Sequence, residues 1–141
     1  MNMNKDIQAI RIISAAIIIG ATLFAAVVLF LNKIEHIPMA PELDPIIGYT
    51  GIILAAAFIS ISFLVFKKRS ETAASANENE KKEIYRSAVI LQFALLDGPA
   101  IFNIIAYMLT GNKQSIIIAA CCIIVMLTQF PSEEKYNRFG G

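Results

Sequence analysis

The sequence predicts an all-α integral membrane protein, a four-helix bundle built from two helical hairpins. Apolar residues make up 57% of the 141 residues and charged residues 16%, against about 45–50% and about 25% in soluble domains. The apolar excess lies in four long blocks, as expected for a bilayer core of ~30 Å that requires about 20 apolar residues per crossing. Because backbone polar groups in hydrocarbon must be bonded internally, each block is expected to be helical.

The four expected spans cover residues 7–31, 46–66, 84–109 and 115–130 of a single domain, 1–141. The first is longer than the ~7–15 apolar residues of a secretion signal and no cleavage site closes it, so we expect a retained span. The connection 32–45 holds three of the five prolines and is expected to be a structured loop. The connection 67–83 is polar, and we expect its middle to be mobile.

Two short signals predict helix ends in the second half of the chain. Gly111, in the turn between the third and fourth spans, suits a left-handed helix terminus. Pro131 is expected to stop the fourth span. Ser132 then predicts the cap of a short interfacial turn in which Tyr136 and Phe139 face lipid.

The basic residues predict the orientation of the chain. Ten of the 12 Lys and Arg residues lie on one side of the expected membrane, and only Lys33 and Lys113 lie on the other. By the positive-inside rule, both termini and the linker 67–83 are cytoplasmic, and we expect a bacterial cytoplasmic (inner) membrane. The residues expected to anchor this topology and to contact anionic lipid are Lys67, Lys68, Arg69 and Arg86.

Asp97 is the one acidic residue inside an expected span, and it lies ~20 Å along the helix from Ile84. Pro99 removes a backbone bond to the carbonyl of Leu95, so Asp97-Gly98-Pro99 predicts a kink whose freed carbonyl takes a donor from a protonated Asp97 or another span. Two alternatives are a proton or ion site and an intersubunit contact. The groups expected at matching depth are Gly20, Thr22, Ser60, Cys121 and Cys122.

The third span also carries a polar stripe, formed by Gln92, Asn103 and Tyr107. We expect these side chains to hydrogen-bond to neighbouring helices, and the alternative is a polar pathway through the bundle. Small residues predict close helix packing, within the chain by preference over an oligomer. They are Ala16, Gly20, Gly51, Ala55 and Ser60.

Other features argue against several classes of function. The net charge of +1 gives no case for a nucleic-acid partner. The adjacent Cys121 and Cys122 predict no disulfide. His36 without a second nitrogen or sulfur ligand predicts a solvated acidic loop rather than a metal site. Because no catalytic motif is present, we expect a non-enzymatic structural or accessory subunit without cofactor. Its expected partners are lipid and either copies of itself or other membrane subunits.

One segment has a resemblance to a known family. Ala94-Leu95-Leu96-Asp97 followed by Ala100-Ile101-Phe102 lies in a span covering about a fifth of the chain. This span resembles the carboxylate-bearing helix of rotary ATPase proteolipids, the c-type ring subunits. The resemblance implies that Asp97 carries a translocated proton or sodium ion, which makes an ion-translocating subunit the alternative function. The chain departs from that family in lacking a dense glycine repeat and in placing Gly98-Pro99 after the acid.

Overall fold

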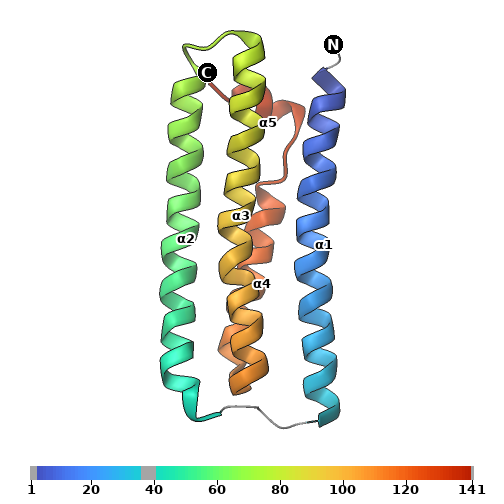
Figure 1. Ribbon diagram of the computed structural model, residues 1–141, viewed down its shortest axis with the longest axis vertical. Helices are drawn as coiled ribbons and strands as arrows, with labels where there is room; N and C mark the ends of the chain where they lie inside the picture. The colour runs from blue at the N-terminus through green and yellow to red at the C-terminus, as the bar shows by residue number, and fades with distance from the viewer. Residues whose placement is uncertain (1–2, 36–40, 141) are drawn as a thin grey trace.

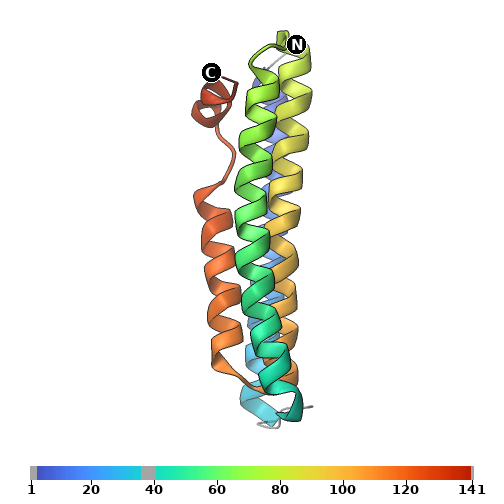
Figure 2. The same cartoon turned by 90° about the vertical axis from the view of Figure 1, so that its left-hand side faces the viewer.

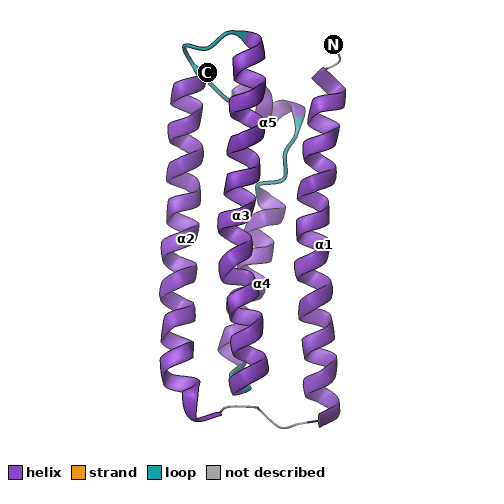
Figure 3. Ribbon diagram, viewed as in Figure 1, coloured by secondary structure: helices purple, strands orange, loops and turns teal. Residues whose placement is uncertain are grey.

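The computed structural model describes residues 3–35 and 41–140, and these residues form helices and no strand. Four helices run along the long axis of the molecule (Figure 1): α1 (Met3–Glu35), α2 (Asp44–Ala73), α3 (Glu78–Thr110) and α4 (Lys113–Thr128). A 3-10 turn, η1 (Pro41–Leu43), precedes α2, and a short α5 (Glu133–Arg138) follows α4. Figure 3 shows how little loop separates these elements. The all-α prediction is confirmed.

Local capping explains where the helices begin and end. Pro45 occupies the first turn of α2, where its missing N–H costs nothing. Asn77 accepts a hydrogen bond from the N–H of Glu80 at 2.9 Å and so caps α3. Asn112 caps α4 in the same way, accepting from the N–H of Gln114 at 2.9 Å. Gly111 ends α3 with a φ of 73°, which confirms the predicted left-handed terminus.

The polar segment 67–83 is helical except in its middle. α2 continues to Ala73 and α3 begins at Glu78, so only residues 74–77 lie outside the helices. The physical reason is that Lys, Glu and Ala are strong helix formers in water, so a helix continues after its apolar run has ended. The α2–α3 turn, the start of α1 and α5 all lie at one end of the molecule (Figures 1 and 2).

Three helical segments are long and apolar enough to cross a membrane by length and composition. They are the whole of α2, the whole of α3, and the part of α1 that covers Ile7–Lys33. The apolar α4 is shorter, with 16 residues. It stops before Phe130, because the residue preceding a proline is disfavoured in the helical region and Pro131 cannot donate a backbone bond.

The core is built around α3, which packs against α1, α2 and α4. α1 and α2 flank α3, and α4 lies behind it (Figures 1 and 2). Apolar side chains at helical spacing on α3 are completely buried, which accounts for its central position. They are Val89, Phe93, Leu96, Ala100 and Ile104.

Gly51 marks the closest approach between α2 and α3. A Cβ atom built at Gly51 would lie 2.3 Å from the side-chain oxygen of Asn103, far inside van der Waals contact. The exposed Gly20 on α1 is a natural comparison, because a Cβ atom there would meet nothing within 4 Å. Only the first of these glycines is required by packing within the chain.

We therefore expect Gly51→Ala to destabilise the purified protein by about 1–3 kcal/mol, because Asn103 or α2 must move to admit the methyl group. Gly20→Ala is the matched control and should change stability by no more than about 0.5 kcal/mol. Thermal unfolding in mild detergent measures both. Equal stability of the two variants would contradict the close approach.

Candidate functional site

The polar stripe of α3 is fully enclosed. Gln92 and Asn103 have 0% of their surface exposed, and Tyr107 has 6%. Each residue bonds to a different element. The amide nitrogen of Asn103 donates to the carbonyl of Gly51 on α2 at 3.3 Å and to that of Pro99 at 2.8 Å. Tyr107 accepts a hydrogen bond at 2.7 Å from the amide of Asn32 on α1.

Apolar packing interrupts the stripe between its two amides. Gln92 and Asn103 are separated by three turns of α3, ~16 Å of helical rise. Phe93, Leu96 and Ala100 lie between them and are completely buried. This arrangement favours hydrogen bonding between helices over a continuous polar pathway through the molecule.

Asp97 lies outside this stripe and is half-buried. Its carboxylate accepts no hydrogen bond from the residues in the described ranges 3–35 and 41–140. The expected donors at matching depth are bonded within their own helices: Thr22 donates to the carbonyl of Ile18, and Ser60 to that of Ala56, each at 2.8 Å. An unpaired charge at mid-membrane depth costs ~2.5–3.5 kcal/mol on insertion scales.

The donor expected at the predicted kink is not found among the described residues, and the kink itself stays a prediction. α3 continues through Pro99 without a break (Figure 1), and no described side chain donates to the carbonyl of Leu95. Pro99 is buried, whereas Gly98 is exposed. A Cβ atom at Gly98 would lie 3.6 Å from the ring of Phe58 on α2, an ordinary contact. The nearest side-chain hydrogen bond in this segment is the one that Asn103 donates to the carbonyl of Pro99.

The small residues divide between the inside and the outside of the molecule. Gly51 and Ala55 are buried where α2 meets α3. Ala16, Gly20 and Ser60 are exposed, and a Cβ atom added at Gly20 would meet nothing within 4 Å. The spacing of small residues does not show whether they face the inside or the outside of the molecule. The expectation of packing within the chain therefore holds for only two of the five residues.

The residues expected to anchor the topology lie on the surface. Lys67, Lys68, Arg69 and Arg86 are all exposed. In the described part of the chain, the one ion pair joins Arg138 to Glu134 within α5. The expected contact of these four residues with anionic headgroups stays a prediction.

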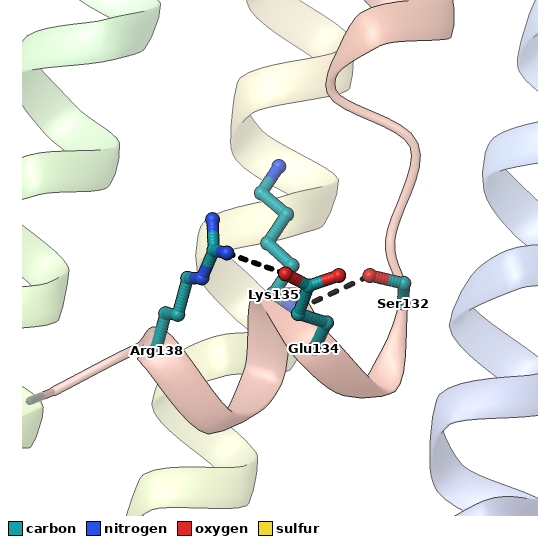
Figure 4. Close-up of polar contacts among 4 residues, drawn as sticks. All are labelled: Ser132, Glu134, Lys135 and Arg138. Atoms are coloured by element: carbon teal, nitrogen blue, oxygen red, sulfur yellow. Dashed lines mark hydrogen bonds and ion pairs between the residues drawn. The ribbon is translucent and has the colours of Figure 1, made fainter.

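The α5 segment forms an aromatic cluster that the sequence analysis did not find. Ser132 caps α5 by accepting a bond from the N–H of Lys135 at 3.1 Å, as predicted (Figure 4). The expectation that Tyr136 and Phe139 face lipid is wrong, since only 3% and 2% of their surfaces are exposed. Their rings pack on Tyr85 of α3 at 5.2 and 5.1 Å, and Phe139 also contacts Phe66 of α2 at 5.3 Å.

Lys135 joins α5 to the end of α4. Its ammonium points toward α3 (Figure 4) and donates to the carbonyl of Gln129 at 2.8 Å and to the amide oxygen of Gln92 at 3.4 Å. It also lies 4.5 Å from the centre of the Phe66 ring. Burial lowers the pKa of Lys135 from 10.5 to about 8. The lysine thus stabilises the carbonyl end of α4 while giving up part of its own hydration.

The expected absence of a metal site falls partly outside the described residues, because His36 and the side chain of Glu35 are not among them. Within the described residues, no group of three or more His, Cys, Asp or Glu side chains could hold a metal ion. Cys121 is exposed and Cys122 is buried, and both are free thiols.

Comparisons with family models, with curated proteins and with solved structures found no match for this chain. The resemblance of the third span to rotary ATPase proteolipids therefore stays a prediction.

A double-mutant cycle can measure the strength of the hydrogen bond between Asn32 and Tyr107. We expect Asn32→Ala and Tyr107→Phe to be coupled by about 0.6 kcal/mol, and by no more than about 1.7 kcal/mol, because hydrogen bonds between membrane helices are worth this much. Unfolding of the four proteins in detergent measures the coupling. Strict additivity of the two substitutions would contradict a bond between α1 and α3.

The lowered pKa of Lys135 predicts that the free energy of unfolding rises with pH. Its pKa of about 8 in the folded chain lies below its ordinary value of 10.5, so the unfolded chain binds more protons between these values. Stability should increase across this window, on the order of a few kcal/mol, and Lys135→Met should remove the increase. Lys68→Met, at an exposed position, is the control and should keep it. Unfolding between pH 7.5 and 10.5 gives the comparison.

Proposed function

We propose that this chain is an integral membrane protein with four crossings that serves as a non-enzymatic structural or accessory subunit. It acts by helix packing with copies of itself or within a larger membrane complex. The proposal rests on the hydrogen bonds of the polar stripe. Each of its members, Gln92, Asn103 and Tyr107, bonds to another element of the same chain, and none lines an open site. The proposal includes no cofactor and no nucleic acid.

The exterior supports a membrane location. Large apolar side chains are exposed on α1, α2 and α4, where lipid would cover them. These include Ile12, Ile19, Leu23, Val27, Phe30, Ile46, Ile53, Leu64, Ile117, Ile124 and Leu127.

The end of α4 supports a fourth crossing. Its 16 residues rise by ~24 Å, and residues 129–132, outside the helices, add up to ~13 Å, which together exceed a hydrocarbon core of ~30 Å. The N–H groups of Gln129 and Phe130 are bonded to α4, and Pro131 has none. Lys135 donates to the carbonyl of Gln129, which supplies one further backbone partner of the kind that hydrocarbon requires.

The proposed orientation places both termini and the α2–α3 turn in the cytoplasm of a bacterial cell. Two features support it. The start of α1, the turn and α5 lie at one end of the molecule (Figure 2). That end holds ten of the 12 basic residues, as the positive-inside rule predicts for a cytoplasmic face.

A second candidate function is translocation of a proton or ion through Asp97. The half-buried carboxylate without a partner favours it, and so does the resemblance of the third span to proteolipids. The apolar layer of Phe93, Leu96 and Ala100 weighs against a route through the interior. A route would have to run along the outside of α3, shared with another subunit.

Asp97→Asn separates the two functions. An accessory subunit should appear, in mild detergent, in particles heavier than the monomer, and Asp97→Asn should leave proton flux unaffected. A translocating subunit should instead keep its assembly and lose proton flux into vesicles loaded with a pH-sensitive dye. A wild-type protein that is monomeric in native membranes and in mild detergent would refute the accessory role.

A further inference from the structure

The central helix α3 is open on one side. It packs against α1, α2 and α4, but α1 and α2 make no extended contact with each other within the described ranges. The two helices flank α3, and the side opposite α4 is left uncovered (Figures 1 and 2). We call this strip the open side of α3, defined by the exposed residues Ile90, Ala94, Gly98 and Ile105. Its middle consists of the small residues Ala94 and Gly98.

Asp97 lies at the edge of the open side. At ~100° per residue it is about 60° from Ala94 around the helix, on the edge away from Gly98 and Phe58. Its carboxylate has no partner among the described residues, whereas each member of the polar stripe on the same helix makes at least one side-chain hydrogen bond, although the amide nitrogen of Gln92 and the amide oxygen of Asn103 are buried without a partner. A carboxylate at mid-membrane depth is stabilised by a cation or a strong donor close to it. The missing group must therefore come from a molecule that approaches the open side.

A second copy of this chain does not provide a cation at that depth. Arg86 is eleven residues from Asp97 on α3, ~16 Å of helical rise. Arg11 lies near the end of α1, with its guanidinium 5.7 Å from the centre of the Phe130 ring. The remaining basic residues also lie toward helix ends. Copies with the same orientation in the membrane would place all these groups away from the level of Asp97.

We infer that the open side of α3 is a docking site for a transmembrane helix of a different protein, one with a lysine, arginine or histidine near its middle that pairs with Asp97. This inference rests on the proposed accessory role and specifies its partner. The small side chains of Ala94 and Gly98 allow the incoming backbone to approach, and the carboxylate selects the partner by charge. Desolvation strengthens the pairing, because no water competes for either group.

A designed peptide tests the docking site directly. The full-length protein is reconstituted in phosphatidylcholine vesicles and titrated with a labelled Leu/Ala transmembrane peptide carrying one central lysine. Energy transfer reports association. We expect the lysine peptide to bind the wild type at least about tenfold more tightly than the same peptide with leucine or asparagine at the centre. Equal binding of the three peptides would overturn the inference.

Variants of the protein locate the contact. Asp97→Asn should abolish the preference for lysine. Gly98→Leu should weaken binding of every peptide by filling the open side, and it keeps the test valid if Asp97→Asn fails to fold. Gly20→Leu, on the exposed face of α1, is the matched control and should bind as the wild type does. Retention of the lysine preference in Asp97→Asn, or undiminished binding of the peptides to Gly98→Leu, would place the contact elsewhere and overturn the inference.

Particles from native membranes distinguish this inference from the accessory role. If heavier particles persist unchanged in Asp97→Asn and Gly98→Leu, the docking site is wrong while the accessory role stands. If the wild type is monomeric, the accessory role fails, and the peptide titration still decides the chemistry of the open side. A photo-crosslink from position 94 that yields a homodimer would show that a second copy occupies the site, which would also overturn the inference.

Discussion

The structure depends on how a polar group is satisfied inside an apolar assembly. Asn103 and Tyr107 on α3 are buried beyond the reach of water, so each needs a partner from another helix. Asn103 donates to the carbonyl of Gly51 on α2, and Tyr107 accepts a hydrogen bond from Asn32 on α1. These directional bonds add little free energy each, but together they fix how α1 and α2 are placed against α3, where apolar contacts alone would tolerate sliding.

The same constraint explains why the chain continues beyond α4. A helix end that is buried away from water leaves carbonyl groups without donors. Lys135 of α5 donates a hydrogen bond to the carbonyl of Gln129. The rings of Tyr136 and Phe139 pack α5 against Tyr85, and Phe139 also contacts Phe66. The short final helix is thus a cap for α4 that is built from distant sequence and anchored by aromatic packing.

The sequence predicted the helical class, the left-handed terminus at Gly111 and the cap at Ser132, because each depends on local chemistry or on long apolar runs. It did not predict the inward position of Tyr136 and Phe139, since six residues of α5 contain too few turns for a face to be recognised. Small-residue spacing likewise identified Gly51 and Gly20 together, although only Gly51 meets another helix. Apolar runs mark burial in lipid and not helix length, so they missed the extension of α2 to Ala73.

The polar residues of α3 therefore belong to two groups with different roles. The group that faces inward, Gln92, Asn103 and Tyr107, is bonded within the chain, and a change there acts on stability. Asp97 lies at the edge of the same helix, and its carboxylate makes no bond within the described residues. A neutral residue of similar size at position 97 would disturb no described contact. We propose that the carboxylate serves an interaction outside this chain, either with a cationic helix or with a moving proton.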